Sequence, residues 1–190
     1  MSLDGVACTT KTTILKSIMK DSAVSDRICV HLSDYKEASD TLQMNPREPT
    51  LNGMSYILYR SNASEQYDSS KSHLCDRQPA AAIIYYMIFN DYTDEKIVEY
   101  FAWMKRNGLT EGWKSLIVLP KEGQEKLVKD MMVSRANGVD LCTEKYVVDQ
   151  RRVFLLWAQV MNYPVVEIDF EQPLEPQQRR IVEHVYKTIL

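Results

Sequence analysis

The chain has 190 residues, of which 45% are hydrophobic and 26% are charged, and its formal net charge is −3 at pH 7. This composition fits a globular protein with one sizeable core. It is not the strongly basic composition of proteins that bind nucleic acid or anionic membranes, so these two classes are excluded. A phosphate-binding pocket is compatible with it, because such a pocket needs only a few local donors. We expect a single domain over residues 1–190, with no nucleic-acid partner and no membrane partner.

The start of the chain carries no secretory signal, and its most apolar run, residues 80–89, is too short to span a bilayer. We therefore expect an intracellular protein. In that compartment the cysteines are expected to be free thiols. Because no two of them form a C-x-x-C pair, we do not expect a zinc site. The four cysteines are Cys8, Cys29, Cys75 and Cys142.

Hydrophobic patterns and turn residues predict strands that alternate with helices along the chain. After a short first strand that ends at Asp4, the predicted strands are residues 28–32, 72–76, 116–119 and 165–168. The predicted helices are residues 12–20, 54–60, 80–89, 93–107, 122–134, 144–161 and 176–189. This order predicts a helix-rich, three-layer α/β fold with a mostly parallel central sheet, partly truncated by its short first strand. Ligands of such folds bind beyond the carboxyl ends of the strands.

Residues 4–13 follow the first strand and open the first helix, which is the context that a phosphate-binding P-loop needs. Gly5, Lys11 and Thr12 fit the pattern G-x-x-x-x-G-K-[ST], but Thr10 stands where the second glycine belongs. A branched residue there resists the backbone dihedrals that glycine permits. The alternative is a threonine-rich helix cap with a solvent-exposed Lys11, and this segment alone favours neither interpretation.

The segment Asp76-Arg77-Gln78-Pro79, followed by small apolar residues and Tyr86, resembles the Asp-Arg-His-Pro motif of the herpesvirus thymidine kinases. This resemblance implies a deoxynucleoside kinase of the P-loop type. It implies that Arg77 contacts the nucleoside or a phosphate, that Tyr86 stacks on the base, and that Gln78 replaces the usual histidine. The alternative is a capped core helix in which Tyr86 is packed inside.

The resemblance extends to the later part of the chain, where the family has a Leu-Pro, an arginine-rich lid and an Arg-Arg-Val-aromatic helix. Residues 121–140 match the lid, and among their cations Arg135 is implied to bind ATP, while Asp130 falls where a lid arginine is expected. Arg151 and Arg152 match the helix, although we expect them to form a solvated helix face rather than to act in catalysis.

The family's general base is a glutamate just after the second strand, and Asp34 is the matching acid, with Glu37 as a weaker candidate. A shorter carboxylate moves the base, and a misplacement of about 1 Å can lower a rate about a hundredfold. By the same resemblance, Mg-ATP is held by the loop with Lys11 on the phosphates, Thr12 on the metal ion and Thr13 beside it.

Three functions are compatible with these residues. The favoured one is a non-catalytic viral descendant of a thymidine kinase, because the loop has lost glycines and the lid has lost arginines. Such a protein has no cofactor and self-assembles as a virion or occlusion-type component, with swapped segments or intermolecular disulfides. The alternative is an active deoxynucleoside kinase that uses Mg-ATP, and a weaker one is a nucleotide-binding regulator. A viral protein is expected in the host cytoplasm or nucleus.

Overall fold

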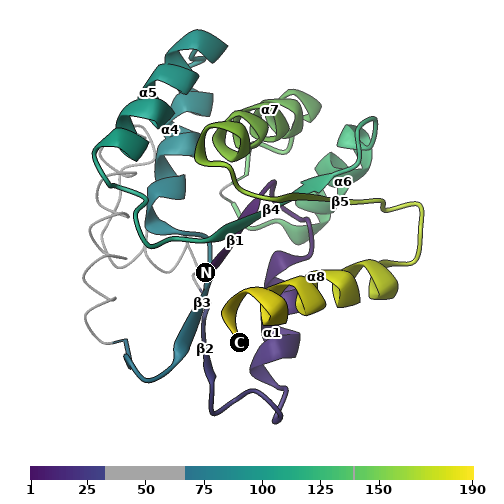
Figure 1. The fold of residues 1–190 in the computed structure, drawn as a ribbon. Coiled ribbons are helices and arrows are strands. Elements are labelled where there is room, and N and C mark those ends of the chain that lie inside the picture. The colour runs from purple at the N-terminus through teal and green to yellow at the C-terminus, as the bar shows by residue number, and fades with distance from the viewer. Residues whose placement is uncertain (33–66, 139) are drawn as a thin grey trace.

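The computed structural model describes residues 1–32, 67–138 and 140–190, and Figure 1 shows their arrangement. A central sheet of five strands lies between two groups of helices. The strands are β1 (Ser2–Gly5), β2 (Ile28–His31), β3 (Ser72–Asp76), β4 (Ser115–Pro120) and β5 (Val165–Ile168). They are all parallel and stand in the order β2-β3-β1-β4-β5. The predicted three-layer α/β fold is therefore confirmed.

Two helices cover one face of the sheet, α1 (Lys11–Met19) and α8 (Leu174–Ile189). Their apolar stripes pack on alternate residues of the strands, because successive side chains of a strand point to opposite faces. This core contains Leu3, Ile14, Leu15, Ile18, Leu74, Val118, Ile168, Ile181 and Val185.

The opposite face carries α4 (Ala82–Phe89), α5 (Asp94–Arg106) and α7 (Glu144–Met161), with α6 (Glu125–Arg135) beside α7. This second core is rich in aromatic residues, and Phe101 meets Trp157 edge-on with ring centroids 4.6 Å apart. Helices α5 and α7 begin where the sequence places caps: the side chains of Thr93 and Thr143 accept hydrogen bonds from the backbone N–H groups of Lys96 and Tyr146.

Three predicted helix starts are corrected by the structure. The run after Gln78 opens as a 3₁₀ turn, η1 (Pro79–Ala81), before α4 begins. Helix α6 begins at Glu125 because Gly123, with φ of +86°, first makes a turn. Helix α8 begins at Leu174, and Pro176 lies in its first turn, where a missing N–H leaves no bond unmade. The predicted helix at 54–60 lies outside the described residues.

The first strand is central, as expected, and it is short. β1 pairs with β4 along four residues but with β3 only through Ser2 and Leu3. The polar strand β3 fits the sheet interior because its buried part is Leu74, Cys75 and Asp76, whereas its first two residues are half-buried.

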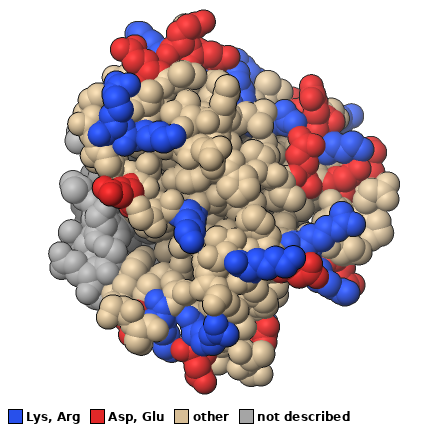
Figure 2. Space-filling model, in the orientation of Figure 1, with Lys and Arg blue, Asp and Glu red and all other residues tan. Residues whose placement is uncertain are grey.

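Charged side chains lie in mixed groups of both signs on the face drawn in Figure 2, without one continuous basic area. Within the described residues, no helix is both long enough and apolar enough to cross a membrane.

Candidate functional site

The chain leaves the carboxyl end of β1 through Gly5, whose φ is +123°. A Cβ atom at this position would lie 2.0 Å from the carbonyl oxygen of Val118 on the neighbouring strand β4. The next residue returns to the same carbonyl, because the Val6 N–H donates to it over 3.2 Å. Only glycine fits here, so the loop after β1 turns sharply while staying close to the sheet.

Two residues of this loop take the left-handed conformation without being glycine: Cys8 has φ of 60° and Thr10 has φ of 61°. Each such residue costs roughly 1–2 kcal/mol. Thr9 between them is buried, and its hydroxyl donates to the carbonyl of Val6 over 2.8 Å. Thr10 was expected to resist the glycine conformation. The structure shows that it adopts this conformation, so the loop keeps its path.

The loop presents a row of backbone donors to the end of the sheet. The Ala7 N–H donates to the side-chain oxygen of Gln150 over 3.0 Å. In the described parts of the chain, the N–H groups of Cys8 and Thr10 donate no hydrogen bond, and those of Lys11, Thr12 and Thr13 lie in the first turn of α1, where no carbonyl of the helix accepts them. These groups lead into the N-terminus of α1, where aligned peptide dipoles favour negative charge, so the segment can bind an anion such as phosphate.

Lys11 is buried at the base of this loop, with 5% of its surface exposed. Its ammonium group donates to the Val6 carbonyl over 2.5 Å and to the Thr9 hydroxyl over 2.9 Å. Burial, together with the nearby positive charge of Arg77, lowers the pKa of Lys11 to about 7. The interpretation of Lys11 as a solvent-exposed residue is therefore wrong, because the loop folds around it.

The first helical turn meets the end of β3. The Thr12 hydroxyl donates to a carboxylate oxygen of Asp76 over 2.8 Å, although 64 positions separate them. A hydroxyl and a carboxylate at the mouth of a phosphate loop can hold Mg²⁺ directly or through water. In the sequence Asp76 stands out only as part of a motif, but its position at the end of the strand beside β1 could have indicated this role.

Arg77 lies beside the loop, with a positive φ of 67°. Its guanidinium donates to the Gly5 carbonyl over 2.6 Å and lies 5.2 Å from the ring centroid of Tyr85. Tyr86 is the tyrosine that the sequence motif indicates, and its hydroxyl lies 3.2 Å from that of Tyr92. The arginine thus lies next to the loop of residues 5–12, and its aromatic neighbours include Tyr85 and Phe154.

Gln78 is buried in a polar network on the α4–α7 face of the sheet. Its backbone N–H donates to Asp4, and its side-chain amide donates to the Ser115 hydroxyl over 2.7 Å. Burial raises the pKa of Asp4, whose carboxylate also accepts from the Ser2 hydroxyl over 2.6 Å. The side-chain oxygen of Gln78 is buried without a hydrogen bond from any described residue. A contact between Gln78 and a nucleoside stays a prediction, as do the roles of Arg77 and Tyr86.

The lid-like segment 121–140 places most of its cations in ion pairs. Arg135 pairs with Asp140, and Lys129 pairs with its neighbour Asp130 over 2.7 Å. Lys121 reaches Asp169, just after β5, over 2.8 Å. In this arrangement acids of the lid-like segment pair with Arg135 and Lys129, and an acid outside it pairs with Lys121.

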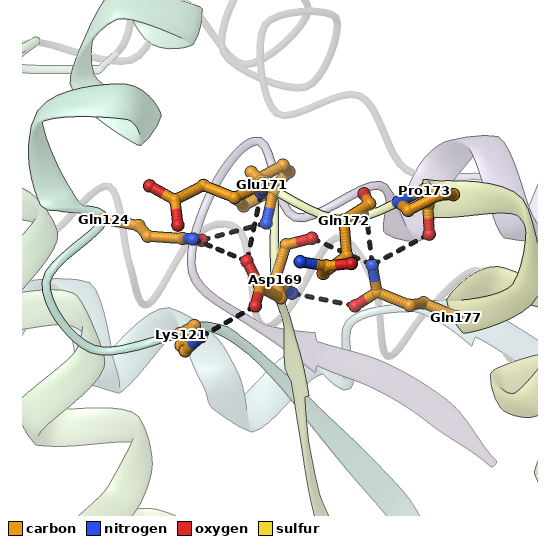
Figure 3. A network of polar contacts seen from close by, with 8 residues as sticks. Lys121, Gln124, Asp169, Glu171, Gln172, Pro173 and Gln177 are labelled. Carbon is orange, nitrogen blue, oxygen red and sulfur yellow. Dashed lines mark hydrogen bonds and ion pairs between the residues drawn. The ribbon is translucent and has the colours of Figure 1, made fainter.

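Asp169 is the centre of the polar network in Figure 3, which orders the chain between β5 and α8. Besides Lys121, its carboxylate accepts from the Gln124 amide over 2.7 Å and from the Glu171 N–H over 3.0 Å. The side-chain amide of Gln177 in α8 accepts a hydrogen bond from the Asp169 N–H and donates one to the Asp169 carbonyl. Sequence reasoning missed this network, although Asp169 follows directly on a predicted strand.

The two arginines of α7 join elements rather than facing solvent. Arg151 pairs with Glu167 of β5 over 2.5 Å and donates to the Pro120 carbonyl of β4. Arg152 pairs with Asp94 at the start of α5. The expectation of a solvated helix face is wrong, because each side chain is at least partly buried and bridges to another element. Asp34 and Glu37, the candidate bases, lie outside the described residues.

Comparisons with known proteins support the fold described above. No family model matches the chain. Over 189 residues it is 30% identical to the "Uncharacterized 33.9 kDa protein in PE 3'region" of Lymantria dispar multicapsid nuclear polyhedrosis virus. The match covers 100% of this chain but 64% of the viral relative, so the chain spans about two thirds of that protein's length.

Two solved structures of deoxyadenosine kinase from M. mycoides share the fold. The one with bound dATP has a TM-score of 0.65 at 14% identity and covers 97% of this chain and 98% of its own. The one with bound dCTP has the same TM-score and identity and covers 98% and 100%. The chain therefore has the fold of the P-loop nucleoside kinases. A specific likeness to the thymidine kinases of herpesviruses is not among these findings.

Proposed function

We propose that the chain binds a magnesium nucleoside triphosphate on residues 5–12 and transfers the terminal phosphoryl group to a deoxynucleoside. The observation that carries this proposal is the conformation of the loop. Cys8 and Thr10 take the left-handed conformation, and Lys11 is folded inside. An ordinary helix cap needs neither two strained residues nor a buried lysine, and strained residues cluster at functional sites.

The residues around the loop divide the work of phosphoryl transfer. The N–H groups of residues 8–13 and the Lys11 ammonium stabilise the negative charge of the phosphates. Thr12 and Asp76, which are hydrogen-bonded to each other, would hold the magnesium ion, and this ion would supply positive charge to the phosphates. Arg77, whose guanidinium donates to the Gly5 carbonyl, would supply positive charge to the transferred group.

In the reaction, a base removes the proton from the sugar 5′-hydroxyl, and the resulting oxygen forms a bond to the terminal phosphorus. The bond from this phosphorus to the bridging oxygen breaks, and the nucleoside diphosphate leaves with that electron pair. Asp34 is the proposed base. The deoxynucleoside as acceptor is supported by the two structural neighbours, which are deoxyadenosine kinases.

A second candidate function is that of a non-catalytic, self-assembling viral protein. The ion pairs of the lid favour it, because Arg135 and Lys129 are neutralised by acids instead of facing the loop. The relative in a nuclear polyhedrosis virus is consistent with a viral origin. On this alternative the nucleotide site is a remnant, and copies of the chain are the partners.

The test is a phosphoryl-transfer assay on the purified, reduced chain with Mg-ATP and each of the four deoxynucleosides, together with calorimetric titration and light scattering. We expect transfer to at least one nucleoside. In Lys11→Met we expect ATP affinity to fall about ten- to hundredfold, since a hydrogen bond to a charged group contributes about 1.5–3 kcal/mol. Lys16→Met is the matched control, because Lys16 is an exposed lysine of the same helix.

The outcomes separate the candidates. Binding without transfer would identify a nucleotide-binding regulator. Absence of binding, together with large ordered assemblies, would overturn the kinase and support the self-assembling protein.

A further inference from the structure

A cluster of metal-binding side chains lies on strands β2 and β3, at the edge of the sheet. The parallel register pairs Cys29 with His73 and His31 with Cys75. Paired residues point to the same face, and so do residues two apart on one strand. Cys29, His31 and His73 therefore share the face opposite to the one on which Ile28 and Leu74 pack toward α1 and α8.

The ligand atoms of these three residues converge. The sulfur of Cys29 and one ring nitrogen from each histidine all lie within 4.8 Å of one another, and the three side chains are half-buried. Nε2 of His31 lies 2.8 Å from Nδ1 of His73. Two of the chain's three histidines thus meet beside a cysteine.

The surroundings orient the two imidazoles. Nε2 of His73 lies 2.7 Å from the carbonyl oxygen of Asp68, so it carries the proton and its Nδ1 turns a lone pair toward the cluster. The ring of Tyr67 stacks on both histidines, with centroids 4.1 Å from His31 and 4.5 Å from His73. A hydrogen bond donated by the far ring nitrogen to a backbone carbonyl is the usual support of a metal-bound histidine.

We propose that Cys29, His31 and His73 bind one Zn²⁺ ion, with a water molecule as the fourth ligand. One thiolate and two imidazoles are the soft and borderline donors that zinc prefers over the oxygen ligands of magnesium or calcium. In a tetrahedral zinc site with bonds of about 2.0–2.3 Å, ligand atoms lie roughly 3.3–3.8 Å apart. The two histidine nitrogens need to separate by less than about 1 Å to reach this spacing. The ion replaces the proton between them, and the Cys29 thiol releases its proton on binding.

The site would fasten the edge of the sheet. β2 has four residues and, among the described strands, pairs only with β3. A metal ion held by both strands would tie β2 to β3 beyond their backbone hydrogen bonds. Because the folded chain would bind the ion much more tightly than the unfolded chain, zinc is expected to raise the thermal midpoint. This site is separate from the phosphate loop, so it stands or fails independently of the proposed kinase activity.

The test is a titration of the chelator-treated, reduced chain with Zn²⁺ against a chromophoric competitor, and with Co²⁺ as a spectroscopic probe. We expect one ion per chain and a thiolate-to-cobalt charge-transfer band. Cys29→Ser is expected to abolish the band, and His31→Gln and His73→Gln to weaken zinc binding at least tenfold. The matched controls are Cys142→Ser and His184→Gln, the remaining histidine, which should both bind as the wild type does.

Circular dichroism of each variant shows whether it is folded, and the wild-type stoichiometry and cobalt band decide the question even if a variant fails to fold. Substoichiometric zinc, a cobalt spectrum without the thiolate band, or equal affinities in Cys29→Ser and Cys142→Ser would each overturn the site.

Discussion

The phosphate loop and the lid-like segment both depart in sequence from what a nucleoside kinase needs, but the structure treats them differently. In the loop, residues 8 and 10 keep the glycine conformation, and a row of N–H groups stays unbonded within the described chain. In the lid, Arg135 and Lys129 are neutralised by neighbouring acids. Lost glycines can be absorbed at a cost in stability, whereas a cation paired with an acid is withdrawn from the phosphates. The loop therefore supports binding more strongly than the lid supports turnover.

The largest effect is expected at the start of the loop. Gly5→Ala should lower the free energy of unfolding by about 3 kcal/mol or more, because the added Cβ meets the Val118 carbonyl and the φ is unfavourable. Gly123→Ala is the control: it also has a positive φ, but nothing lies within 4 Å of its Cβ. It should lose only about 1 kcal/mol. Denaturant unfolding measures both, and equal losses would mean that the close approach to β4 is unimportant.

The second prediction concerns pH. The pKa of Lys11 is lowered from 10.5 to about 7 in the free chain, and bound phosphates favour its charged form. Nucleotide binding should therefore take up a proton above pH 7, and affinity should fall by up to about tenfold per pH unit as the pH rises from 7 toward 10. Calorimetry in buffers of different ionisation enthalpy measures the uptake, which Lys11→Met should abolish.

The same group has the opposite effect on stability. Between pH 7 and 10.5 the unfolded chain holds more protons on Lys11 than the folded chain does. The contribution of Lys11 to the free energy of unfolding therefore rises with pH across this window. The free energy of unfolding is measured against pH for the wild type and for Lys11→Met. If the difference between the two stays constant from pH 7 to 10.5, the burial of this lysine is contradicted.

A smaller effect is expected from restoring a glycine. Thr10→Gly should raise the free energy of unfolding by about 1 kcal/mol, because it removes left-handed strain and a buried hydroxyl without a hydrogen bond from a described residue. It should also leave nucleotide affinity unchanged or improved. Ser17→Gly, in the interior of α1, should be destabilising. If Thr10→Gly were equally destabilising, residue 10 would not be strained.

The smallest effect should come from the lid. Asp140→Asn removes the ion-pair partner of Arg135, and stability should change by less than about 1 kcal/mol, since partly exposed ion pairs contribute little. Any phosphoryl transfer should increase, because the arginine is then available to the phosphates. Glu175→Gln, which breaks an ion pair of α8 instead, should leave transfer unchanged. Equal rates in both variants would show that Asp140 does not restrain Arg135.

Local signals predicted the fold well. Helix α7 was placed correctly at both ends because Thr143 caps it and its apolar stripe is long. The parallel sheet followed from the alternation of strands and helices. The site was harder, because its contacts join distant positions: Thr12 meets Asp76, Lys11 turns inward, and Gln150 reaches Ala7. The cysteine–histidine cluster depends on the register of β2 against β3, which no spacing within one strand reveals.

The most direct test of the phosphate loop is to follow its backbone amides by NMR while Mg-ATP is added to the isotope-labelled chain. If residues 8–13 surround the phosphates, their amide resonances should move together, with the same affinity that calorimetry measures, and Lys11→Met should weaken the shift. If those resonances stay in place while others move, or if none moves at millimolar nucleotide, the loop does not bind phosphate.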